Sequence, residues 1–143
     1  MPAGTSYLFK ENMLGKRLLP VEGTDTPQYR FTVRNHFLHA VHPVGWIKTL
    51  DVEIDGKLCG DRDVWFIVRG QWFSASKLET ISEVFWNLCE QAEICFSTDV
   101  SLAVGKHHVK CTFSTSLLED TQVLDVKNVY SLRVEFVDGE LEL

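Results

Sequence analysis

Short segments in which apolar and polar residues alternate recur along this chain, and turn residues separate them. In residues 29–34, for example, Tyr29, Phe31 and Val33 are each followed by a polar residue. A period of two is typical of a β-strand that buries one face. Similar segments, one of them apolar on both faces, predict further strands at residues 50–55, 64–69, 92–97, 106–113 and 129–137. About seven short strands in total predict an all-β protein, an antiparallel β-sandwich or barrel.

A hairpin can be placed directly after the second of these strands. The pair Asp55-Gly56 ends the alternating segment 50–55. Asp-Gly is typical of two-residue hairpin turns, in which both residues take positive φ angles. We therefore expect the chain to reverse here and return through Lys57 to Cys59.

One segment has a helical rather than a strand-like pattern. Ser76 and Glu79 have the spacing of a capping box, in which two side chains satisfy free backbone amides at the start of a helix. Apolar residues then recur at positions 78, 81, 85 and 88, which lie on one face of an α-helix. The sequence predicts one short α-helix over residues 77–88.

The length of the chain limits how many units it forms. A chain of 143 residues is close to the usual size of one domain. We expect a single β-sandwich domain over residues 1–143, with residues 1–6 and the acidic residues 138–143 frayed. Segments 36–45 and 117–128 have no clear period, and loops of this length often carry binding sites.

Charge and composition exclude several classes of protein. The net charge is −6, the wrong sign for a protein that binds nucleic acid or an anionic membrane without sequence specificity. The chain has no apolar stretch of about 20 residues and no signal-peptide pattern at its start, so we expect a cytoplasmic protein. Its four cysteines stand singly, and we expect free thiols that fill space in the core.

Three histidines, His36, His39 and His42, fall within seven residues and are followed by Pro43. Imidazole binds divalent transition metals, so these residues could form a catalytic metal site. A spacing of three suits a helical turn, however, and Pro43 does not support a helix there. We therefore predict no metal site and interpret the segment as a loop whose rings pack against a neighbouring surface.

The other candidate catalytic groups have structural interpretations. His107 and His108 would point to opposite faces of a strand, so they cannot hold one ion together, and His107 is expected to be a buried, hydrogen-bonded imidazole. The chain has no Gly-x-Ser-x-Gly nucleophile motif, no cysteine-enzyme signature and no phosphate-binding glycine loop. The sequence predicts no catalytic residues. Its four tryptophans and nine phenylalanines predict an aromatic core, with some rings free for a subunit contact.

Several short segments, in this order, resemble a known family. They are Phe-Lys-Glu-Asn at 9–12, Tyr-Arg-Phe-Thr-Val-Arg at 29–34, Leu-Asp-Val-Glu-Ile-Asp-Gly at 50–56, Val-Trp-Phe-Ile-Val-Arg-Gly at 64–70, Phe-Trp at 85–86 and Val-Gly-Lys-His at 104–107. Together they make residues 7–115 similar to the beta subunit of bacterial C-glycoside deglycosidases.

This resemblance implies an all-β small subunit bound to a larger alpha subunit, a TIM-barrel protein of the sugar isomerase type that carries Mn²⁺ or Mg²⁺. The family's complex cleaves the carbon–carbon bond between an aromatic, flavonoid-type aglycone and a 3-oxo sugar. The C3 ketone acidifies the proton at C2, and the bond from C1 to the arene then breaks by β-elimination. The metal and the base are expected on the alpha subunit, so this chain would bind no cofactor itself.

The loop after the first predicted strand departs from the family pattern. Family members carry an aromatic pair and Arg-Gly there, whereas this chain has Asn-His-Phe-Leu-His-Ala-Val-His-Pro at 35–43. Residues of this loop are expected to face the partner or the aglycone, and they are His36, Phe37, Leu38, His39, His42 and Trp46. Two other functions remain open: a free-standing carbohydrate-binding module with an exposed row of tryptophans, and a metalloenzyme that uses His36, His39 and His42.

Overall fold

The computed structural model describes residues 14–35, 41–44, 47–60, 63–81, 83–87, 90–116 and 132–143. In these residues the protein is all-β, as the alternating segments predict. The strands are β1 (Leu19–Val21), β2 (Gln28–Arg34), β3 (Val41–Pro43), β4 (Ile47–Ile54), β5 (Lys57–Leu58), β6 (Val64–Val68), β7 (Gln71–Ser74), β8 (Phe85–Asn87), β9 (Gln91–Ser97), β10 (Lys106–Ser116) and β11 (Leu132–Glu142).

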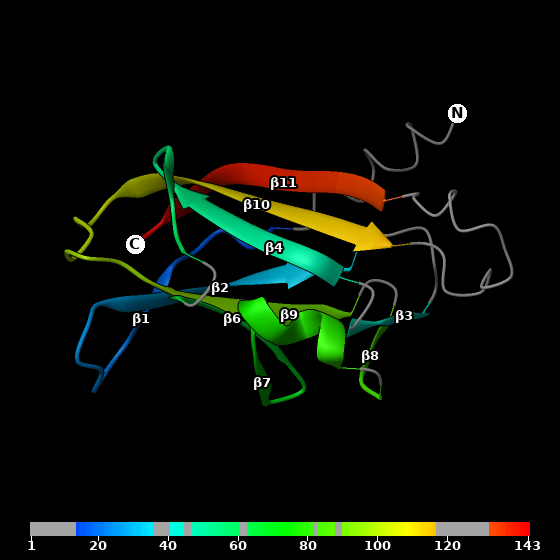
Figure 1. The fold of residues 1–143 in the computed structure, drawn as a ribbon. Helices are drawn as coiled ribbons and strands as arrows, with labels where there is room; N and C mark the ends of the chain where they lie inside the picture. Colours follow the sequence, from blue (N-terminus) through cyan, green and yellow to red (C-terminus); the bar gives the residue numbers. More distant parts are fainter. Residues whose placement is uncertain are drawn as a thin grey trace, which may run out of the picture.

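These strands form two main sheets that face each other (Figure 1). One is five-stranded with the order β1-β2-β9-β6-β7, and the other is four-stranded with the order β11-β10-β4-β5. Strands β3 and β8 pair separately as a two-stranded ribbon at one end of the sandwich. Neighbouring strands within each sheet are antiparallel.

The core lies between the two sheets and is rich in aromatic rings. Strand β2 buries Tyr29, Phe31 and Val33, the three residues that the alternation assigns to the inner face. The indole of Trp86 is fully buried, and its ring centroid lies 5.0 Å from that of Phe66 in an edge-to-face arrangement. Such pairs add stability beyond the apolar area that they bury.

The predicted hairpin after β4 is confirmed. Asp55 and Gly56 have φ angles of 52° and 86°, and β5 returns alongside β4 with Glu53 opposite Leu58. Glycine adopts positive φ without a steric penalty, and aspartate tolerates it better than most residues. Strand β6, the segment that is apolar on both faces, lies inside its sheet, because β9 and β7 flank it.

The predicted α-helix over 77–88 is wrong. A six-residue 3-10 helix, η3 (Ala75–Thr80), occupies the first part of this segment and is capped by Ser74 rather than Ser76. The backbone of Lys77 leaves helical geometry within it, at φ −127°. Strand β8 follows, and it buries Trp86 while Phe85, on the expected helical face, is 41% exposed. Burial of the largest side chain in the core therefore prevails over the local helical pattern.

The prediction that residues 138–143 fray is also wrong. Strand β11 continues through this segment in register with β10, with Leu141 opposite His107 and only 1% exposed. Glu142 is held from its other side, because its N–H donates to Lys16 O and its carbonyl accepts from Leu18 N–H. Backbone pairing and the apolar Leu141 thus outweigh the acidic composition. On the outer face of β11, Phe136 is 44% exposed.

Among the described residues, no helix is long and apolar enough to cross a membrane.

Candidate functional site

The loop that the sequence analysis selects lies mostly outside the described residues. His36, Phe37, Leu38, His39 and Trp46 belong to that undescribed part. His42 lies on β3, where its backbone is in register with Trp86 of β8. The proposed role of these six residues stays a prediction, but the structure does describe the chain on both sides of residues 36–40.

A buried polar network holds the base of this loop. Asn35 is fully buried, and its side chain donates to Trp86 O at 2.8 Å. Its backbone N–H and the indole N–H of Trp86 both donate to Glu90 O, at 3.1 and 2.8 Å. The guanidinium of Arg69 pairs with the Glu90 carboxylate and donates to Phe85 O at 2.7 Å. Buried polar groups are costly unless they are hydrogen-bonded, so this network favours one arrangement of the chain.

The network fixes both ends of residues 36–40. The loop leaves from Asn35, which is bound to Trp86, and returns at Val41, which pairs with Asn87 in the ribbon of β3 and β8. Both ends therefore rest on β8. Sequence reasoning missed Asn35, Arg69 and Glu90, although an amide directly after an alternating strand and before a loop was a usable signal.

A second constellation lies at the opposite end of the sandwich, around His107 on β10 (Figure 1). His107 is 9% exposed, its Nε2 lies 2.6 Å from Ala103 O, and its Nδ1 lies 2.6 Å from Asp55 Oδ2. The other oxygen of Asp55 accepts from the backbone N–H of His108 at 2.8 Å. The ring can donate to both acceptors only when it carries two protons. His107 is thus a buried, hydrogen-bonded imidazole, as predicted.

This geometry changes the protonation of both partners. The Ala103 carbonyl and then the Asp55 carboxylate raise the pKa of His107. The hydrogen bond from His107 lowers the pKa of Asp55. Opposite shifts of this kind are typical of an ion pair. The exposed His108 points away from His107 and lies 3.2 Å from the Asp138 carboxylate, which agrees with the prediction that the two rings face opposite ways.

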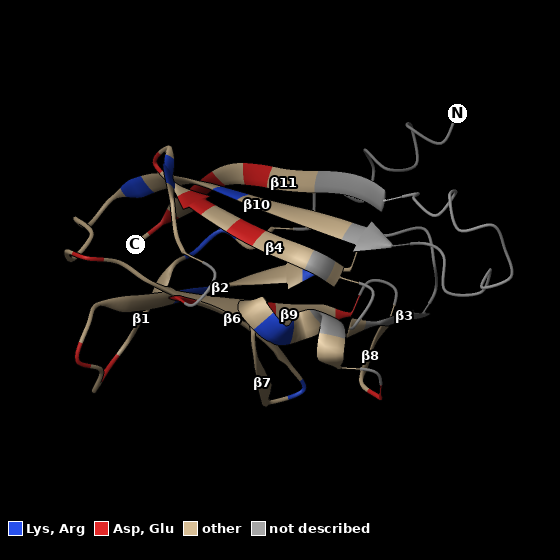
Figure 2. Ribbon diagram, viewed as in Figure 1, with Lys and Arg blue, Asp and Glu red and all other residues tan. Residues whose placement is uncertain are grey.

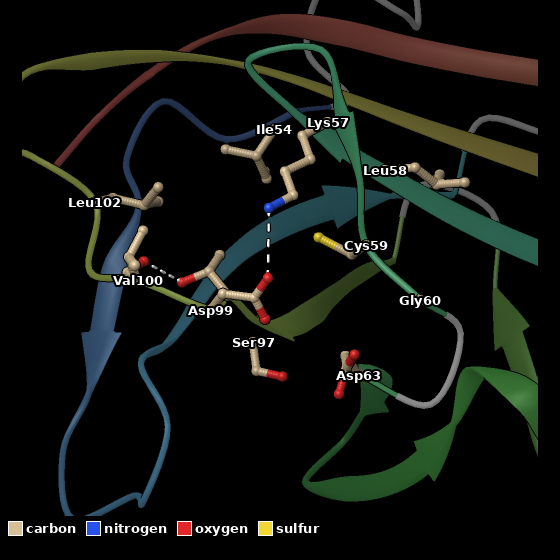
Figure 3. A pocket seen from close by; sticks show the side chains of 11 residues that line it. Ile54, Lys57, Leu58, Cys59, Gly60, Asp63, Ser97, Asp99, Val100 and Leu102 are labelled. Atoms are coloured by element: carbon tan, nitrogen blue, oxygen red, sulfur yellow. Dashed lines mark hydrogen bonds and ion pairs between the residues drawn. The ribbon is translucent and has the colours of Figure 1, made fainter.

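His107 also joins the two walls of a surface groove. One wall is the hairpin of β4 and β5, and the other is the segment that follows β9. The space between them is about 190 Å³. Figure 3 shows Lys57 reaching across the groove to Asp99, with 3.4 Å between Nζ and Oδ2. The lining residues are Ile54, Lys57, Leu58, Cys59, Gly60, Asp63, Ser97, Thr98, Asp99, Val100 and Leu102.

The thiols in the described part of the chain have high pKa values. Cys59, Cys95 and Cys111 are free, and burial raises the pKa of Cys95 to about 11. Burial and the nearby Asp63 carboxylate raise the pKa of Cys59, in the groove, to about 11. Burial also raises the pKa of Cys111. Because the thiolate is the reactive form, these cysteines are poor nucleophiles at neutral pH.

Within the described ranges, no group of three or more His, Cys, Asp or Glu side chains is placed to hold a metal ion. The tryptophans in these ranges differ in environment: Trp86 is in the core, Trp65 is partly buried and Trp72 is 49% exposed.

Comparison with known proteins gives one family. A family model described as C-glycoside deglycosidase beta subunit matches residues 18–117. The match runs from β1 to β10 and leaves β11 outside. No curated protein matches the chain significantly.

Proposed function

The chain belongs to the family of C-glycoside deglycosidase beta subunits, and from this we propose that it is the small subunit of a heteromeric carbon–carbon lyase. The family name implies an alpha subunit as its partner. The proposed substrate is a 3-oxo-C-glycoside with an aromatic, flavonoid-type aglycone. The match over residues 18–117 is the observation that carries this proposal.

In this proposal the alpha subunit, a TIM-barrel protein of the sugar isomerase type, supplies the base and the divalent metal. A base removes the C2 proton, which the C3 ketone acidifies, and the electron pair forms the C1–C2 double bond. The bond from C1 to the arene breaks, and its electron pair stays on the arene carbon, which takes up a proton. The role of Mn²⁺ or Mg²⁺ would be to stabilise the enolate charge.

The described residues support a structural role for this chain in that reaction. His107 is engaged on both sides of its ring, and the described thiols have raised pKa values, so these groups serve the fold. The network of Asn35, Trp86, Glu90 and Arg69 holds both ends of residues 36–40 on β8. We propose that this loop, with His42 and Trp46, faces the aglycone end of the alpha subunit's active site.

Reconstitution tests this proposal. The two subunits are purified separately, and cleavage of a 3-oxo flavonoid C-glycoside is followed with each subunit alone and with the mixture. We expect cleavage by the mixture and none by this chain alone. Cleavage by the isolated, metal-free monomer at the rate of the complex would overturn the proposal, as would a mixture no more active than the alpha subunit.

A double variant tests the role of the loop. Phe37→Ser with Leu38→Ser should weaken association with the alpha subunit and leave the melting temperature of the isolated chain unchanged, because loop residues contribute little to a sandwich core. Trp72→Ser, a change to a half-exposed aromatic residue on β7, is the matched control and should leave association unchanged. A double variant that unfolds would show that residues 37 and 38 belong to the core, and one that associates normally would exclude them from the contact.

A further inference from the structure

The groove between the β4–β5 hairpin and the segment after β9 is bordered by exposed apolar side chains on that segment. Val100, on the segment after β9, is 70% exposed, and Val104, further along the same segment, is 89% exposed. Leu58 lies opposite Glu53 in the pair of β4 and β5, and its side chain points away from the groove (Figure 3). Ile54 and Leu102 form more deeply buried parts of the lining. Exposed apolar residues that surround a cavity are typical of a surface that another molecule covers.

The groove also carries excess negative charge. Its lining contributes the carboxylates of Asp63 and Asp99 and the ammonium of Lys57. Lys57 already pairs with Asp99, and no basic side chain within the described ranges lies at ion-pair distance from Asp63. On the neighbouring sheet, acidic residues lie on β4 and β11 and basic residues on β10, the strand between them (Figure 2). An approaching group would therefore be favoured if it were positively charged.

The volume of the groove limits its occupant. Pockets for drug-sized ligands typically measure about 300–1,000 Å³, and this space measures about 190 Å³. It is therefore too small to enclose a flavonoid glycoside. A single arginine or lysine fits better, because its long aliphatic stem can pack on Val100 and Leu102 while its charged end meets Asp63.

We propose that the groove is a docking site for one basic side chain, arginine or lysine, on a surface of the alpha subunit. This inference rests on the proposed function, which supplies that partner. The site is separate from the contact proposed for the loop, since β3 and β8 lie at the other end of the sandwich (Figure 1). The link from Asp55 through His107 to Ala103 joins the two walls.

Two variants test the site in the reconstituted complex. Asp63→Lys reverses the charge of the acidic side chain, and Val100→Ser removes an exposed apolar side chain from the lining. Each should weaken binding of the alpha subunit by about tenfold or more, as expected for loss of an anchoring contact. The dissociation constant is measured by titration calorimetry with thermal melts of each isolated variant, so that misfolding is recognised separately.

Matched control variants lie at the β1–β2 edge of the five-stranded sheet, outside the lining of the groove. Asp25→Lys changes the charge of an exposed residue between β1 and β2, and Leu19→Ser changes an apolar residue of β1 that is 43% exposed. Neither should alter the dissociation constant. Equal effects of the groove variants and their controls, or no effect of folded groove variants, would overturn the inference. The proposed function would fail differently, through lack of association or cleavage with the unchanged chain.

A photoreactive residue identifies the occupant. Val100 is replaced by p-benzoylphenylalanine, the complex is irradiated, and the crosslinked peptide is sequenced by mass spectrometry. We expect an alpha-subunit peptide with an arginine or lysine within two residues of the attachment point. A crosslink to a second copy of this chain, to its own residues or to an alpha-subunit segment without a basic residue would contradict the proposal.

Discussion

The double hydrogen bond of His107 predicts an unusual loss of stability at alkaline pH. Its two ring nitrogens each lie 2.6 Å from an oxygen, one of Ala103 and one of Asp55. These acceptors raise the pKa of His107 above its ordinary value of 6.5. Below pH 6.5 the ring is charged in both the folded and the unfolded protein, and the stabilisation is complete. As the pH rises through the raised pKa, the folded protein loses the second proton and this stabilisation disappears.

The expected loss can be worked from the two hydrogen bonds. A hydrogen bond to a charged group contributes about 1.5–3 kcal/mol to stability. The Asp55 side chain is 49% exposed, so screening by water favours the lower value. The neutral ring can donate to only one of its two acceptors, and the free energy of unfolding should therefore fall by about 1.5 kcal/mol. For a domain of this size the melting temperature would decrease by about 5 °C.

The assay compares the native chain with His107→Gln at pH 6 and pH 9. Glutamine retains a donor for the Ala103 carbonyl but does not titrate, and its lower absolute stability cancels when the two pH values are compared. The native chain should lose about 5 °C more than the variant between these pH values. Cys59 and Cys95, with pKa values of about 11, add little below pH 9. Parallel losses in both proteins would refute the assignment of a charged, doubly bonded His107.

Three further changes test other parts of the structure. Trp86→Ala removes a fully buried indole and should lower the free energy of unfolding, measured with urea, by about 3–5 kcal/mol. A loss below about 1 kcal/mol would show that the core does not depend on this ring. Gly56→Ala, at φ +86°, should lower the free energy of unfolding by about 1 kcal/mol because alanine is strained at a positive φ. Gly60→Ala, at a position without a positive φ, should lower it less. Equal losses in the two variants would contradict the turn geometry. In a Cys89→Ser background, Cys59 should react with iodoacetamide at pH 8 about 100-fold more slowly than an exposed thiol, because its pKa is about 11; labelling at the ordinary rate would contradict this pKa.

Periodicity predicts the sheets well because one face of each strand is buried. The alternation in β2 identifies its three core residues, and the Asp55-Gly56 pair locates the hairpin after β4. Both signals are local: one comes from the pleat of the strand and the other from the φ angles that a two-residue turn requires. The fold class follows from such signals alone, whereas the order of strands in each sheet depends on pairings between distant segments.

The two errors in secondary structure also have a common physical origin. The helical spacing at 78, 81, 85 and 88 and the acidic composition of 138–143 are local properties. Trp86 is instead placed by rings from other strands, since its ring centroid lies 5.0 Å from that of Phe66 and 5.8 Å from that of Phe113. Leu141 is similarly held opposite His107 by pairing with β10. Tertiary contacts therefore override the weaker local preference in both segments.

The groove shows how far a sequence can lead toward a site. Asp55 is predictable as a turn residue, and His107 as a buried imidazole, because each conclusion needs only local sequence. Their contact joins residues 52 positions apart, and it exists because β4 and β10 pair in the register that sets Val109 opposite Ile54. Alternation fixes which face a residue occupies but not which residue lies across from it. A site built from two connecting segments therefore depends on the register of β4 and β10. The turn that reverses the chain at Asp55 also supplies the carboxylate that joins the two walls of the groove.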